Sequence, residues 1–395
     1  MFDLRVLVQS TGDLDVGKIS SFVSSIPEAK LVVFHCSVND DAVLENFEKS
    51  IAGKLSVPLV GVRVSASLTN TGFYEDSVVV GVFSGDFDVK VFHDELVFEN
   101  SEKVIESIAS KLPKNGLCLA YAACYYTDGS RLDYILRNIA IKRPALQFSG
   151  LISSPKPMVF SMNGPLKNSL VYVVFQGVDL TNKFVSGFEL DEKGQEFTVT
   201  KSDDFHILEI DNKNAVSLYC GLKHVRPYMV NALTNQLNKP SVHKIIKLLS
   251  DASGDMYETI MKTAIEILGT LKSDGFVEPI PMQMADELRS RWTSHCYVFV
   301  GTKLRWIRYD PDKLIDQYTV VEKKLVGASA IFSHECVFRL FYMNFRVKDI
   351  ERKVSKFKVP LMLSYGYGEI GAYIPYTDKN VNMVHGGIIQ VLGFK

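Results

Sequence analysis

Short apolar runs alternate with amphipathic segments along most of this 395-residue chain, and this alternation constrains its fold more than any other feature. Runs such as Leu4–Val8, Leu31–His35 and Leu117–Ala123 have the length and apolar character of buried strands. Glu102–Leu112 places its apolar side chains on one face of a helix. Strands that alternate with helices predict an α/β (mixed α+β) fold, with mixed β-sheets flanked by helices.

The middle of the chain follows a different pattern. Residues 213–273 have mostly helical periodicity, with a break near Ser253 and Gly254, and the strand–helix alternation returns in the last third. The two halves share this coarse style. We therefore predict two related lobes, an α/β domain over residues 1–190 and a second over 191–395 that contains the helical segment.

Composition limits the classes of partner. The chain is 47% hydrophobic and 23% charged, with a formal net charge of −1. It therefore has the makeup of an ordinary globular protein and lacks the basic footprint of a nucleic-acid binder. We find no signal peptide, no apolar run that could span a bilayer and no C-x-x-C among six scattered cysteines. We expect a cytoplasmic protein that binds neither nucleic acid nor membrane.

Two glycine motifs imitate nucleotide-binding sequences. Gly366, Gly368 and Gly371 spell G-x-G-x-x-G, but Pro375 and the lack of helical periodicity argue against the helix that a dinucleotide site requires. We interpret this motif as a turn between two strands. The stretch 12–18 has P-loop spacing, but Ile19 replaces the Ser or Thr that would hold Mg²⁺. We interpret it as a polar turn before a helix.

Several stretches resemble, in order, the FIST (F-box and intracellular signal transduction) domain proteins, over roughly residues 30–394. The chain departs from the family pattern at Phe338, Ala372 and Gly386. The stretches that carry the resemblance are Pro58–Val62, Asp76–Phe83, Phe148–Leu151, Cys336–Arg339, Tyr367–Gly371 and His385.

The resemblance implies an intracellular sensory protein that binds a small ligand, an amino acid or a related metabolite, without catalysing a reaction. With no output region fused to it, such a protein would stand alone and signal through a protein partner. Some bacterial relatives bind haem, so a haem-binding gas sensor is one alternative. The F-box relatives suggest another, a protein-interaction module. We predict no cofactor.

The closing motifs supply the candidate ligand-binding residues. Arg339 could grip a carboxylate and Glu369 an ammonium group, which together would clamp a zwitterion, or the two could form a structural ion pair with each other. Tyr365 and Tyr367 could form aromatic walls of a pocket or pack in the core. Gly368 and Gly371 would let the backbone approach a ligand closely.

Imidazole and thiol groups complete the candidates. Cys336, with His334 two residues away, could act as the nucleophile of a thiol-dependent enzyme, although a buried inert thiol is the more common outcome. His385 could bind a ligand or a haem iron, or serve a structural role. His-Cys neighbours recur at residues 35–36 and 295–296. Adjacent residues of a strand face opposite ways, so each His-Cys pair would offer only one metal ligand, and we predict no metal site. We also predict no catalytic residue.

Overall fold

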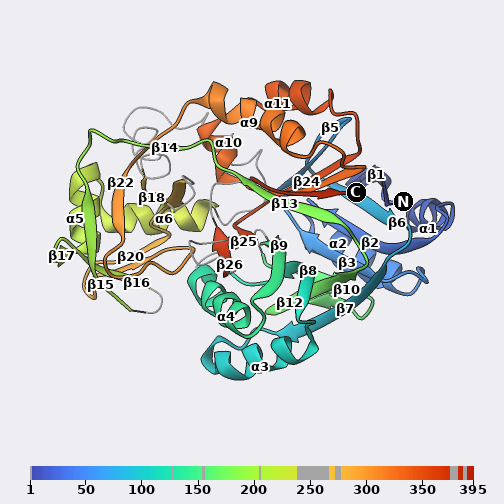
Figure 1. Ribbon diagram of the computed structural model, residues 1–395, viewed down its shortest axis with the longest axis horizontal. Helices are drawn as coiled ribbons and strands as arrows, with labels where there is room; N and C mark the ends of the chain where they lie inside the picture. Colours follow the sequence, from blue (N-terminus) through green and yellow to red (C-terminus); the bar gives the residue numbers. More distant parts are fainter. Residues whose placement is uncertain are drawn as a thin grey trace.

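The computed structural model describes residues 2–125, 128–153, 156–203, 206–237, 267–271, 277–373, 381–385 and 389–395. It contains mixed sheets flanked by helices, which confirms the α/β class. A large body and a smaller lobe lie side by side in Figure 1, with both termini in the body. No helix in the described ranges has both the length and the apolar character needed to cross a membrane.

Three six-stranded sheets form the body, and all three follow one plan. Each contains one parallel pair of strands, β2 with β3, β8 with β9, or β23 with β24, and the other pairings are antiparallel. The first sheet has the order β1 (Asp3–Ser10), β6 (Ser77–Ser84), β2 (Ala29–Cys36), β3 (Leu59–Arg63), β10 (Val159–Ser161) and β11 (Gly164–Leu166). The second has the order β7 (Asp88–Glu95), β12 (Ser169–Gln176), β8 (Asn115–Ala122), β9 (Ala145–Ile152), β25 (Glu369–Tyr373) and β26 (Val381–His385). The third has the order β13 (Leu180–Val185), β27 (Ile389–Phe394), β23 (Ala330–Cys336), β24 (Leu361–Gly366), β4 (Ala66–Thr69) and β5 (Gly72–Tyr74).

The three sheets exchange hairpins in a cycle. The hairpin β4–β5 leaves the first segment of the chain to join the third sheet, β10–β11 joins the first sheet, and β25–β26 joins the second. The next strand along the chain then returns to the sheet that the hairpin left. These returning strands are β6 in the first sheet, β12 in the second and β27 in the third. The body is therefore a threefold repeat of one unit, a finer arrangement than the two related lobes expected from the sequence. The predicted boundary near residue 190 falls where the chain leaves the body, and residues 311–395 return to it.

Helices cover the outer face of each sheet, and their apolar stripes pack on the strands beneath. Asp15, Asp40 and Asp310 cap α1, α2 and α9 by accepting backbone N–H groups. The cap at Asp15 confirms the polar turn predicted before the first helix. The helices are α1 (Val16–Ser24) and α2 (Asp41–Ala52) on the first sheet, α3 (Ser101–Lys111) and α4 (Gly129–Lys142) on the second, and α9 (Pro311–Lys324), α10 (Phe338–Tyr342) and α11 (Val347–Val354) on the third. Short 3₁₀ turns, Thr11–Asp13 and Phe98–Asn100, precede α1 and α3.

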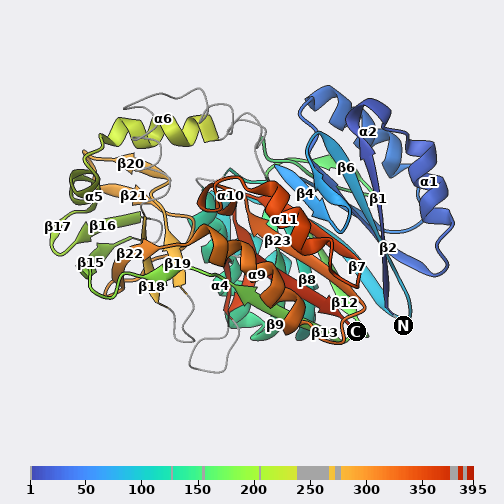
Figure 2. The ribbon, with the colours of Figure 1, turned by 90° about the horizontal axis from the view of Figure 1, so that it is seen from above.

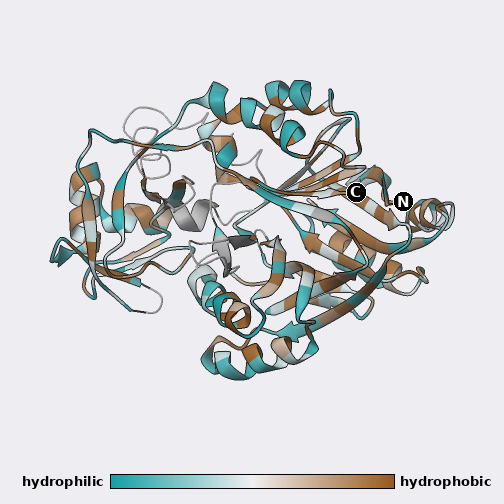
Figure 3. Ribbon diagram, in the orientation of Figure 1, coloured by the Kyte–Doolittle hydropathy of each residue, from teal (hydrophilic) through white to brown (hydrophobic). Residues whose placement is uncertain are grey.

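The inner faces of the three sheets enclose a common core, with Phe83, Phe175, Phe332 and Phe394 among its members. Hydrophobic residues follow the strands of the body, while the outer helix faces are largely hydrophilic (Figure 3). His35, Tyr121 and His334, one from each sheet, meet in this core with ring centroids 5.6 to 6.2 Å apart. Burial lowers the pKa of His35 to about 3, so this imidazole is neutral.

A fourth sheet forms the smaller lobe, which lies at one end of the molecule in Figure 2. Its strands follow the order β19 (Val277–Ile280), β18 (Leu268–Leu271), β22 (Lys303–Arg308), β15 (Phe197–Ser202), β16 (His206–Ile210), β21 (Arg291–Thr293) and β20 (Met284–Asp286). Two short strands join its side, β14 (Glu189–Leu190) on β22 and β17 (Lys213–Asn214) on β16. The helices α5 (Ala215–Lys223) and α6 (Pro227–Leu237) belong to the helical segment predicted over 213–273, while residues 238–266 lie outside the described ranges.

Candidate functional site

A cavity of about 310 Å³ opens where the parallel strand pairs of the three sheets end. Arg63 is the last residue of β3, Ser153 follows β9 and Tyr367 follows β24, so one residue comes from the same place in each sheet. The carboxyl ends of parallel strands are where open α/β sheets bind ligands. The threefold plan therefore concentrates three such ends on one site.

The cavity has a buried floor and a polar rim. Arg63, Ser153, Met158 and Tyr367 are at most 3% exposed, and they form the floor. The hydroxyl of Ser153 lies 3.0 Å from two backbone oxygens, Arg63 O and Met158 O, and can donate to either of them. The rim consists of Asp41, Glu45, Tyr125, Lys156, Pro157 and Lys167.

Charges of both signs line the cavity. Asp41 lies 2.7 Å from Arg63 Nη1 and 2.6 Å from Lys156 Nζ. Burial acts to raise the pKa of Asp41, but the hydrogen bonds and charges of Lys156 and Arg63 outweigh it and lower the pKa. The Lys167 ammonium forms no hydrogen bond or ion pair with any described residue, so this cation is available to an anionic group.

A second carboxyl group lies behind the rim. Asp41, Glu45 and Glu48 follow each other at helical spacing on one face of α2, toward Arg63. Glu48 is 1% exposed, and burial raises its pKa to about 8 although the charges of Arg63 and Lys167 act in the opposite direction. The floor of the cavity thus adjoins an acid that stays protonated at neutral pH.

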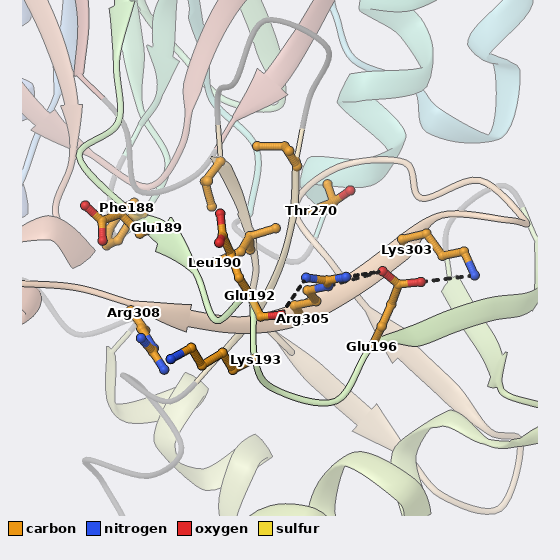
Figure 4. Close-up of a pocket in the computed structure, with 12 residues that line it drawn as sticks. Phe188, Glu189, Leu190, Glu192, Lys193, Glu196, Thr270, Lys303, Arg305 and Arg308 are labelled. Carbon is orange, nitrogen blue, oxygen red and sulfur yellow. Dashed lines mark hydrogen bonds and ion pairs between the residues drawn. The ribbon is translucent and has the colours of Figure 1, made fainter.

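A larger hollow of about 950 Å³ lies beside β22 and the β14 strand (Figure 4). Three of its basic side chains are paired with carboxylates. Arg305 Nη2 lies 2.8 Å from Glu196 Oε2, and Lys303 Nζ lies 3.3 Å from Glu196 Oε1 (Figure 4). Arg308 Nη2 pairs with Asp191 at 2.6 Å. The smaller cavity has a buried charged floor and gathers the strand ends of all three sheets, so it is the better candidate for a ligand site.

The structure pairs Arg339 with an acid other than Glu369. Arg339 is fully buried and donates from Nε to Glu335 Oε1 at 2.6 Å, four residues earlier in the chain. Its guanidinium also donates to the backbone oxygen of Ser186. Arg339 therefore forms an ion pair with Glu335, and a ligand clamp built from Arg339 and Glu369 remains a prediction.

Tyr365 belongs to the same buried network. Its hydroxyl lies 2.9 Å from the hydroxyl of Tyr318, which donates to Glu335 Oε2 at 2.6 Å. Burial raises the pKa of Glu335, while Arg339 and Tyr318 act to lower it. These groups satisfy one another within the core, which is the packing role that the sequence left open for Tyr365.

Glu369 faces the interior at the start of β25. It is fully buried, and its carboxyl group has no side-chain hydrogen-bond partner among the described residues; its own backbone N–H is the one group that acts on it by a hydrogen bond. Burial, together with the negative charges of Glu335 and Glu278, raises its pKa well above the usual range. In the β25–β26 register His385 lies directly opposite, so the two side chains share a face of the sheet.

The glycines of this turn have steric roles. Gly366 ends β24 and Glu369 begins β25, which confirms the predicted turn between two strands. Gly368 has a φ of 149°. At Gly371 a β-carbon would lie 2.4 Å from Cζ of Phe184, so this glycine makes room for an aromatic ring and for the Gln390 amide. Neither glycine lines the cavity described above.

Cys336, His334 and His385 are all at most 2% exposed. His334 Nδ1 lies 2.9 Å from the Ser364 hydroxyl, and its ring packs on Phe332 and Tyr121. Burial and the neighbouring His35 lower the pKa of His334 well below its usual range, which does not favour a general base at neutral pH. His385 packs on Phe184, so a haem would have to displace core packing to reach it.

Sequence reasoning missed the charged residues of the cavity. Arg63, Ser153 and Asp41 follow buried strands within a few residues, and that position was the available signal. Lys156 and Lys167 belong to a loop and a hairpin end whose approach depends on the exchange of β10–β11, which no local pattern reveals.

Residues 30–213 match the model of the FIST N domain. Over these residues the chain is similar to FIST N domains. This region supplies every residue of the cavity except Tyr367, which the last third of the chain contributes. FIST domains form a family of signal-transduction sensory domains, which supports a sensory role. No curated protein matches the chain. The FIST C assignment of the last third remains a prediction.

Proposed function

We propose that this protein is a sensor that binds an amino acid or a related zwitterionic metabolite in the cavity between Arg63 and Tyr367, without transforming it. The observation that carries the proposal is the Arg63 guanidinium, 2% exposed and on the floor of a cavity of about 310 Å³. Asp41 already pairs with Arg63 Nη1 at 2.7 Å, so this buried ion pair fixes the charged floor of the site and leaves Lys167 on the rim for an anionic group of a ligand. The volume lies at the lower end of the range that small-molecule sites occupy.

The charges on the rim suit a ligand with two ends. Lys167 and Lys156 can bind a carboxylate, while Asp41 and Glu45 can accept hydrogen bonds from an ammonium group. Tyr367 below and Tyr125 above offer aromatic faces to the rest of the ligand. The strand ends of all three sheets meet here, so a ligand would bridge parts of the chain that are far apart in sequence. A protein partner could recognise the arrangement of these parts that the bound ligand stabilises.

Calorimetric titration with the common amino acids tests the proposal. We expect at least one to bind wild-type protein and the double variant Lys156→Ala, Lys167→Ala to lose ten-fold or more in affinity, because two charge-assisted contacts disappear. Both side chains are exposed, so the melting temperature without ligand should change little. Lys193→Ala, at the larger hollow, is the matched control and should bind like wild type.

Two results would contradict the proposal. Binding that survives the double variant but is lost in Lys193→Ala would move the ligand to the larger hollow. Heats at the level of dilution for all amino acids, at millimolar concentration, would exclude this ligand class.

A further inference from the structure

A compact group of metal-ligating side chains lies outside the cavity, where the smaller lobe meets the body. Glu278 on β19, His295 and Cys296 each place one donor atom within 4.8 Å of the other two. All three are at most 2% exposed. His385, on β26 of the second sheet, reaches the same group from the body, and its Nδ1 lies 2.7 Å from Glu278 Oε2.

Local structure explains why two neighbouring residues can both contribute. His295 and Cys296 follow the end of β21 in an irregular turn, and therefore the alternation of side chains along a strand does not apply to them. At residues 295–296, both members of a His-Cys pair can therefore face the same site, unlike neighbouring residues of a strand. His295 Nε2 lies 3.1 Å from Glu278 Oε1, and the other Glu278 oxygen is held by His385.

We propose that Glu278, His295 and Cys296 bind a zinc ion, with His385 as a positioning residue that orients the Glu278 carboxylate. A thiolate, an imidazole and a carboxylate form a donor set that zinc accepts, and the soft thiolate disfavours magnesium and calcium. Tetrahedral zinc holds such donors about 3.3 to 3.8 Å apart, so these side chains need to close by only about 1 Å. A second histidine bonded to a ligating carboxylate is typical of the outer layer of metal sites.

A separate observation also favours a cation here. Glu369 shares a sheet face with His385, and in the described part of the chain its buried carboxyl group has no side-chain hydrogen-bond partner. It is near enough for the charges of Glu278 and His295 to influence it. A buried carboxyl group with so few hydrogen bonds is one that a bound water or ion can satisfy. A zinc ion would supply positive charge at this place and would join the smaller lobe to the body.

Cobalt substitution tests the site. Full-length protein is stripped with a chelator and titrated with Co²⁺, and we expect one equivalent to produce a thiolate-to-cobalt charge-transfer band and the visible bands of tetrahedral Co²⁺. Zn²⁺ should abolish both by displacement. Binding requires the thiol and the imidazole to lose their protons, so affinity should fall as the solution is acidified.

Matched variants identify the side chain that produces the thiolate-to-cobalt band. Cys296→Ser should lose it, whereas Cys220→Ser, which alters another buried thiol of the same lobe, should keep it. His385→Asn should keep the band but weaken Co²⁺ affinity about 10- to 100-fold, as loss of an outer-layer partner does. If Cys296→Ser fails to fold, His295→Gln takes its place. A wild-type spectrum without a thiolate band, or a band that survives in Cys296→Ser, would overturn the proposal.

Discussion

Glu48 illustrates how one buried side chain links the stability of the body to the cavity. Burial raises the pKa of its carboxyl to about 8, whereas Arg63 and Lys167 lower it and Glu45 raises it. Between the ordinary carboxyl pKa of about 4.5 and pH 8, the folded protein holds a proton on Glu48 that the unfolded chain releases. The free energy of unfolding should therefore fall as the pH rises through this window.

Replacing the carboxyl with an amide removes this pH dependence. We expect Glu48→Gln to be nearly neutral at pH 5 and to raise the free energy of unfolding by about 2 kcal/mol at pH 9, because the variant no longer buries a charge. Urea unfolding of both proteins at pH 5, 7 and 9 measures the difference. Glu99→Gln, on the surface, is the control and should follow wild type at every pH. A constant difference between Glu48→Gln and wild type would contradict the prediction.

At the scale of elements, the close pairing of β8 and β9 depends on Gly150. A β-carbon at this position would lie 1.7 Å from the backbone oxygen of Ala120, in the neighbouring strand. Backbone cannot move aside as a flexible side chain does, so the two strands would have to separate. The glycine is thus required by packing between strands.

Gly150→Ala should lower the free energy of unfolding by about 3 kcal/mol or more, which is at the upper end for an overpacked core. Gly53→Ala is the matched control, since a β-carbon there would meet nothing within 4 Å. Urea unfolding followed by circular dichroism measures both variants. Equal stability of the two would mean that β8 and β9 can separate at little cost.

The strands and helices of the body were largely predictable, whereas their partners were not. The run Leu117–Ala123 and the helix over 102–112 can be identified because periodicity is a local property. The stretch Cys296–Val300 is apolar enough to suggest a strand, yet it forms none, and Phe299 and Val300 are exposed. The partner of a four-residue strand such as β4 depends on tertiary packing, because β24 lies almost 300 residues away.

The candidate site follows the same division. Tyr367 was identified from its motif, because a motif is local, and it does line the cavity. Arg339 and Glu369 were predicted to clamp a ligand or to pair with each other, yet Arg339 pairs with Glu335, four residues earlier across the junction of β23 and α10. Arg63 and Lys167 meet only after the hairpins have been exchanged, and therefore sequence alone could not bring them together.

At the scale of the whole molecule, the exchanged hairpins make the body one cooperative unit. The second sheet contains β25 and β26 from the end of the chain, and the third sheet contains β4 and β5 from its beginning. The last strand of the chain, β27, lies between β13 and β23 in the third sheet. Cutting the chain near residue 190 would therefore leave unpaired edges in sheets that the intact chain completes.

We expect a fragment of residues 1–190 to lack cooperative unfolding, because it would expose the apolar faces of the second sheet and leave β4 and β9 without partners from the last third. Its urea transition by circular dichroism should be broad and shallow, and its amide protons should exchange rapidly. Mixing it with a fragment of residues 191–395 should restore a cooperative transition if the exchanged strands find their sheets. A sharp transition of fragment 1–190 alone would instead identify it as an independent domain, in agreement with the boundary that the sequence predicts.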